Sequence, residues 1–96
     1  MFSKRKYKLI ERHEKEQYIK LLDAIATKQK EYRLTYEKNA NIVEISPYHF
    51  YLLTEYSNIV SDFCRKIFGM DVRINTFIEN FKDIRCYFKG ENNERI

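Results

Sequence analysis

Two histidines and two cysteines are the side chains most able to act as a base, a nucleophile or a metal ligand. His13, His49, Cys64 and Cys86 could in principle build a zinc site or a catalytic pair. Neither histidine stands at ligand spacing from a cysteine, so a zinc site gains no support. Each cysteine falls on an apolar face of a predicted element, which favours two reduced, buried thiols over a disulfide between them. We expect no bound metal and no cofactor.

Catalytic motifs are also missing from the sequence. There is no nucleophile elbow and no HExxH pair, and two glycines in 96 residues leave few places for a phosphate-binding loop. His49 falls on the apolar side of a predicted helix, where a core histidine is favoured over a general base. His13 stands among charged residues and is expected at the surface. The sequence therefore predicts a protein that is not an enzyme.

Basic residues gather in two places that could contact an anion. Residues 1–38 hold eleven Lys or Arg against six Asp or Glu, a net charge of +5, whereas residues 39–96 have a net charge of −1. A second group falls on the polar face of two predicted strands and includes one tyrosine that could stack on a base. Nucleic-acid binding through the basic amino-terminal segment is therefore the alternative function. The candidate contacts are Lys4, Arg5, Lys6, Lys8, Arg73, Arg85, Tyr87 and Lys89.

A narrow apolar stripe recurs at helical spacing between residues 18 and 36, and it is the candidate protein interface. Its members stand three, four or seven residues apart, close to a coiled-coil seam about three heptads long. Tyrosine is enriched at interfaces because it brings contact area at low entropy cost. The stripe either packs on this chain's own central helix or pairs with a partner, which would make a homo-oligomer or larger assembly. Its residues are Tyr18, Leu22, Ile25, Tyr32 and Tyr36.

The stripe requires a long helix, which we place at residues 11–38. No glycine or proline precedes Pro47, so nothing interrupts a helix there. Upstream of Tyr18, the same face of the helix would carry Glu11 and Glu14, which offer no apolar surface to bury. Residues 1–10 are therefore expected to form a basic segment that either frays into solvent or docks on a partner.

A second, central helix is predicted from Ser46 to Gly69. Ser46 can cap the first turn, Pro47 suits the first helical position, and Gly69 can close the last turn in a left-handed conformation. The apolar positions cover about half of the helix circumference, so we expect them to bury against a sheet and a further helix. The predicted core positions of this helix are Leu52, Tyr56, Ile59, Phe63 and Ile67.

Three short strands complete the predicted body. Residues 42–45 are rich in β-branched side chains, and the stretches 70–75 and 84–88 alternate between apolar and polar positions. A right-handed crossover would make the first two strands parallel, and the third is expected as the second arm of an antiparallel hairpin. The chain is therefore predicted to be one α+β domain over residues 1–96. The long helix is followed by a βαββ body at 41–89 with a small mixed three-stranded sheet, and by a mobile tail at 90–96.

The distribution of apolar and charged residues along the chain predicts where the protein is located. No apolar run approaches the about 20 residues that a membrane helix needs, and the amino terminus is charged where a signal peptide would be apolar. We expect a cytoplasmic protein without a membrane partner.

The last half of the chain resembles small structural or accessory proteins of tailed bacteriophages. The run VEISPYHFYLL, a helix, and then FGMDVRINTFIENFKDIRCYF follow their pattern of a strand, a Ser-Pro-initiated helix and two further strands. The resemblance implies a virion or assembly component, or a phage-encoded protein acting on a host protein. Its place would be the host cytoplasm or the virion, and it implies no enzymatic activity. The residues and the resemblance together predict a non-enzymatic protein-interaction module.

Overall fold

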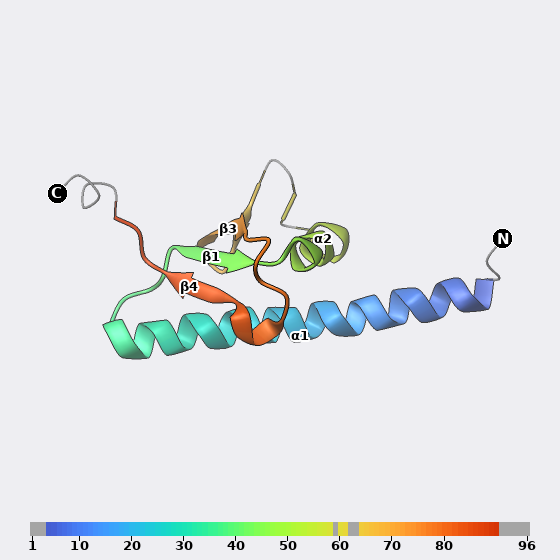
Figure 1. The fold of residues 1–96 in the computed structure, drawn as a ribbon, viewed down its shortest axis with the longest axis horizontal. Helices are drawn as coiled ribbons and strands as arrows, with labels where there is room; N and C mark the ends of the chain where they lie inside the picture. Colours follow the sequence, from blue (N-terminus) through green and yellow to red (C-terminus); the bar gives the residue numbers. More distant parts are fainter. Residues whose placement is uncertain (1–3, 59, 62–63, 91–96) are drawn as a thin grey trace.

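The fold is a mixed α+β arrangement of a long amino-terminal helix, a second helix and a small mixed sheet, as predicted. The computed structural model describes residues 4–58, 60–61 and 64–90, and for residues 4–10 it describes the backbone alone. The predicted core positions Ile59 and Phe63, and the predicted tail beyond residue 90, lie outside the described residues. In chain order the elements are α1 (Lys4–Tyr36), β1 (Ile42–Ile45), α2 (Pro47–Tyr56), β2 (Lys66–Ile67), β3 (Met70–Ile74), the 3-10 helix η1 (Phe81–Asp83) and β4 (Arg85–Tyr87) (Figure 1).

Helix α1 begins seven residues before the predicted start and ends two residues before the predicted end. It ends because Glu37 adopts a left-handed backbone, with φ of 59°, while its amide still donates to the Arg33 carbonyl at 2.8 Å. The chain then turns toward β1, and Gln29 fixes this turn. Its side-chain amide donates to the Ala40 carbonyl at 3.1 Å and accepts from the Ala40 amide at 2.9 Å.

Helix α2 starts where the sequence predicts and ends thirteen residues early. Ser46 Oγ accepts a hydrogen bond from the His49 amide at 3.0 Å, and proline occupies the first helical position. The predicted end at Gly69 is wrong, because Ser57 leaves the helix in an extended conformation. Ser57 Oγ then accepts from the Val60 amide, and Ser61 Oγ from the Cys64 amide. Short polar side chains that bind nearby backbone in this way compete with the helix.

A tight hairpin between β2 and β3 replaces the predicted last turns of the central helix. Both of its central residues have positive φ, 51° for Phe68 and 79° for Gly69, as in a type I′ turn. The left-handed conformation expected for Gly69 is present, but it closes a hairpin instead of a helix. Strand β2 therefore makes the sheet four-stranded, which corrects the predicted three.

The strand order in the sheet is β2-β3-β1-β4. Strands β1 and β3 are parallel, as predicted, with Val43 opposite Val72. The predicted hairpin of β3 and β4 is wrong, because β4 pairs with the other side of β1 in antiparallel fashion. The connection between β3 and β4 contains η1 and is longer than a tight hairpin loop, so it can cross to that side. There the Asn41 side chain donates to the Lys89 carbonyl at 2.9 Å and accepts from the Lys89 amide at 2.8 Å.

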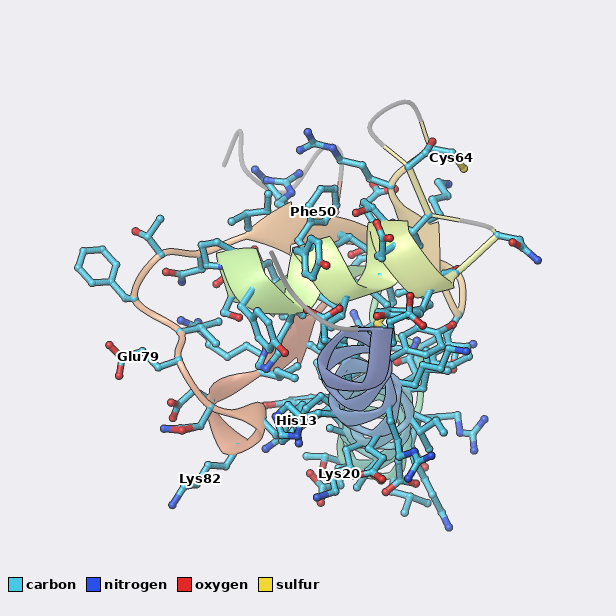
Figure 2. The ribbon with its side chains drawn as sticks, turned by 90° about the vertical axis from the view of Figure 1, so that its right-hand side faces the viewer. His13, Lys20, Phe50, Cys64, Glu79 and Lys82 are labelled. Atoms are coloured by element: carbon cyan, nitrogen blue, oxygen red, sulfur yellow. The ribbon has the colours of Figure 1, made fainter. Side chains whose placement is uncertain are left out.

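The core lies between α1, α2 and one face of the sheet. In Figure 1, α1 runs across the view below the sheet and α2 is seen nearly end-on. In Figure 2, which is turned by 90°, α1 is seen end-on and α2 from the side. The axes of the two helices therefore cross. The amino-terminal turns of α1 extend past α2 and away from the body (Figure 1). The radius of gyration is accordingly 15.4 Å, against about 12 Å for a compact chain of this length. The fully buried side chains are Leu21, Ile25, Val43, Ile45, Leu52, Leu53, Val60, Met70 and Ile84.

Candidate interaction surfaces

His49 is a core residue, as its position on the apolar side of α2 predicts. It is 3 % exposed, and its ring stacks on Phe81 with centroids 4.8 Å apart and planes 11° from parallel. Burial lowers the pKa of His49 below its ordinary value of 6.5, so the ring is neutral near pH 7. Its Nδ1 has no hydrogen-bond partner among the described residues. A neutral, enclosed imidazole is a packing residue and does not reach a substrate.

The two cysteines lie in different environments. Cys64 is exposed, so its predicted burial is wrong, because the helix that was expected to bury it ends at Tyr56 (Figure 2). Cys86 on β4 is partly buried, and burial raises the pKa of its thiol to about 11 despite the nearby Lys28. Both thiols are free. Within residues 11–58, 60–61 and 64–90, no three His, Cys, Asp or Glu side chains stand together to hold a metal ion.

Glu44 organises the sheet face opposite α1. Arg73 and Arg85 are its register partners on the two neighbouring strands, so all three side chains share this face. The Tyr87 hydroxyl donates to Glu44 Oε2 at 2.6 Å, and Asn75 Nδ2 donates to Oε1 at 3.0 Å. These two hydrogen bonds, and then the charges of Arg85 and Arg73, lower the pKa of Glu44.

This network changes the meaning of the predicted anion contacts. The structure brings together Arg73, Arg85 and Tyr87, but around a carboxylate that offsets part of their charge and engages the tyrosine hydroxyl. Lys89 follows β4 and is exposed. The basic positions at 4–8 lie on the first turns of α1, at the end of the helix away from β4 (Figure 1). The two groups therefore do not form one anion-binding surface.

The predicted interface residues on α1, the tyrosine stripe, do not form one continuous surface. The two ends of the stripe line two separate grooves, and the core lies between them. Ile25 is fully buried within the chain, so at this position the stripe packs on its own domain, which is one of the two expected arrangements. On the amino-terminal side of Ile25, Tyr18 and Leu22 line a first groove. On its carboxyl-terminal side, Tyr32 and Tyr36 line a second groove. Four of the five predicted interface residues thus lie on concave surfaces of the domain.

The first groove lies between α1 and the β2-β3 turn and has a volume of about 330 Å³. Tyr18 and Leu22 form one wall, and Ile67, Phe68 and Gly69 form the other, with Ser57 and Lys66 completing the lining. Apart from these last two residues the walls are apolar or aromatic. Water in such a groove is readily displaced by an apolar side chain.

Phe68 stands out at the rim of the first groove. Its side chain is 51 % exposed, and its φ of 51° lies in the left-handed region that bulky residues avoid. Holding a non-glycine residue there costs about 1–2 kcal/mol, and asparagine or glycine is the usual occupant of such a turn. A strained backbone that presents an aromatic ring to solvent is the kind of outlier that marks a functional surface.

The second groove has a volume of about 340 Å³ and is lined by residues from the carboxyl-terminal half of α1 and from β4. Tyr32 and Tyr36 stand on the helix wall with ring centroids 4.5 Å apart. The strand wall consists of residues 84–87, and the remaining lining is polar or charged: Lys28, Glu31 and Thr35.

Three residues that matter at these surfaces were not singled out from the sequence. The only local signal at Phe68 is the glycine that follows it, since glycine between two short apolar runs permits a tight turn. Glu44 and Glu14 have no local sequence signal, because the hydrogen bonds that define their roles come from residues far away in the sequence. Glu14 accepts hydrogen bonds from Tyr51 and Tyr56, both on α2.

Comparison of the chain with protein-family models, with curated proteins and with solved structures finds no match. No helix in the described part of the chain is long and apolar enough to cross a membrane. The resemblance to tailed-phage proteins, and the predicted location, stay predictions.

Proposed function

We propose that this chain is a non-enzymatic protein-interaction module that self-associates, as a subunit of a homo-oligomer or of a larger assembly. The observation that carries the proposal is Phe68, which is half exposed on a strained turn beside an apolar groove. In the monomer about half of this aromatic side chain stays exposed to water. A partner that covers the ring offsets the cost of the left-handed backbone.

A second copy of the chain is the partner that fits this surface. The ring of Phe68 is a projection, and the groove beside it is a hollow lined by Tyr18 and Leu22. A two-fold axis beside the turn brings each ring to the groove of the other copy, since an isologous interface uses one patch twice. Burial of a phenylalanine side chain contributes about 1.5–3 kcal/mol, and the symmetry provides two of them.

Charge at this surface does not oppose such pairing. Lys66 and Asp71 flank the turn as register partners, with Lys66 Nζ 3.8 Å from Asp71 Oδ1. Both side chains are more than half exposed, so their attraction adds little to stability. Their opposite signs nevertheless leave the rim of the groove close to neutral, which permits two copies to meet without like-charge repulsion.

Light scattering during size exclusion tests this proposal. We expect a mass of twice the 11.8 kDa chain at high concentration and a shift toward one chain mass on dilution. A strict monomer over the whole concentration range would overturn self-association. Nucleic-acid binding through residues 4–8 remains the alternative, and a gel shift that weakens steeply with salt would support it.

A further inference from the structure

We infer that the outer edge of β4 binds an extended, acidic segment of a partner protein as an added strand. This inference rests on the proposed role as an interaction module, but it concerns a different surface, the second groove. The occupant is identified by three observations: a strand paired on one side, a groove that follows this strand, and an excess of positive charge on the two segments that carry its walls.

The first observation is the place of β4 in the sheet. It ends the strand order β2-β3-β1-β4, and within the described residues it pairs with β1 alone. The other side of an edge strand presents backbone N–H and C=O groups that can pair with a further chain. An extended peptide can use such an edge, because main-chain hydrogen bonds supply affinity and side-chain pockets supply specificity.

The second observation is the course of the groove. It is lined by four consecutive residues, 84–87, together with the Tyr32 and Tyr36 wall of α1. Successive side chains of a strand point to opposite faces of the sheet. A groove that contacts all four must therefore run along the edge of β4 and not over one face. A strand laid against this edge would place alternate side chains against the two tyrosine rings.

The third observation is the charge of the groove walls. The lining itself holds Lys28 and Arg85 against Glu31. The segments that carry this lining, residues 28–38 and 84–89, together hold six Lys or Arg against two Glu. A second copy would bring this basic surface against itself, whereas an acidic segment complements it. A nucleic acid would match the charge but would leave the backbone groups of the edge without the partners that a peptide strand offers.

The test uses a ten-residue peptide of alternating valine and glutamate, followed by amide chemical shifts of the full chain. We expect saturable shifts centred on 84–89 and 28–36. A peptide with lysine in place of glutamate, and one with N-methyl groups on alternate amides, should each bind at least about tenfold more weakly. Absence of shifts at millimolar peptide, or equal binding of the N-methylated peptide, would overturn the inference. Tighter binding of a ten-nucleotide oligothymidylate at the same residues would overturn it as well.

Two charge-reversal variants on α1 provide a test of the groove and its matched control. Lys28→Glu changes the groove wall, and Lys20→Glu changes a lysine on the side of α1 away from α2 (Figure 2). We expect Lys28→Glu to weaken peptide binding at least about fivefold and Lys20→Glu less than about twofold. Equal effects would indicate general charge attraction and would overturn the assignment to the groove.

The failure of this inference is distinguishable from the failure of self-association. The peptide should bind Phe68→Asn, which alters the first groove, as tightly as it binds the wild type. A monomeric wild type that binds the peptide would contradict only the proposed self-association, and a dimer that does not bind it would contradict only the inference drawn for β4.

Discussion

The Tyr56 hydroxyl on α2 donates a 2.6 Å hydrogen bond to Glu14 Oε1 on α1. Tyr51, one turn earlier on α2, donates to the same oxygen at 3.1 Å. These bonds join α2 to α1, whose amino-terminal turns extend past α2 and away from the body (Figure 1). From the sequence, Glu14 was expected to have nothing to pack against, yet it is a contact that fixes how α2 crosses α1. The pKa of Tyr56 is raised by this hydrogen bond, with burial as the second cause.

We predict that Tyr56→Phe lowers the free energy of unfolding by about 1–2 kcal/mol, because it removes a donor to a charged acceptor. Tyr51→Phe is the matched control, since Tyr51 is 41 % exposed and its bond is longer. It should cost less than Tyr56→Phe in the same urea titration. A Tyr56→Phe variant as stable as the wild type would contradict the role given to this pair.

Glu44 should make stability depend on pH in the acid range. Its folded pKa lies below the ordinary value of 4.5, so its contribution is present above about pH 4.5 and is lost as pH falls through the folded pKa. We expect Glu44→Gln to destabilise the protein by about 1 kcal/mol at pH 7 and the difference from wild type to shrink toward pH 3. Glu79→Gln, at an exposed site, is the control and should match the wild type at both pH values (Figure 2).

His49 should act in a separate pH window. Its folded pKa is below 6.5, so the unfolded chain binds the proton more readily, and stability should fall as pH drops from about 6.5 toward the folded pKa. The slope from one histidine is at most about 1.4 kcal/mol per pH unit. His49→Phe keeps a ring beside Phe81 and should remove this slope. His13→Gln, at an exposed site, should retain it; if His13→Gln removed the slope instead, the assignment to His49 would be wrong.

A substitution at Ile25 tests whether the middle of the tyrosine stripe packs on its own domain. It is fully buried, so Ile25→Ala should cost about 2–5 kcal/mol in chemical denaturation. Leu34 lies on the same helix but is 70 % exposed, and Leu34→Ala should stay within about 0.5 kcal/mol of wild type. Similar costs for the two variants would contradict the packing of α1 on its own domain.

The parts of the fold that follow from local signals could be predicted from the sequence. The long helix follows from the lack of glycine and proline before Pro47, and the start of α2 follows from the Ser46 cap. The end of α2 could not be predicted, because apolar residues at 60 and 67 continue the helical spacing after the chain has left the helix. The glycine at position 69 could not distinguish a helix end from a hairpin, because both a helix end and a type I′ turn need a residue with positive φ.

The sheet order and the surfaces depend on contacts between distant parts of the chain. The alternation at 84–88 predicts a strand, but only tertiary packing decides that it lies beside β1. The stripe on α1 identified four residues that line grooves, whereas the burial of Ile25 between them depends on where the body packs. The role of Phe68 could not be predicted from residue type, since phenylalanine is not a residue that favours tight turns.

The substitution Phe68→Asn tests the central claim most directly, measured as mass by light scattering together with stability at a dilution where all variants are monomeric. Asparagine tolerates the left-handed backbone, so we predict that the monomer becomes more stable by up to about 1–2 kcal/mol while the dimer mass is lost. Phe77→Asn is the control, because Phe77 is 92 % exposed and lines neither groove, and it should keep the dimer. A Phe68→Asn protein that keeps the dimer mass would contradict the account.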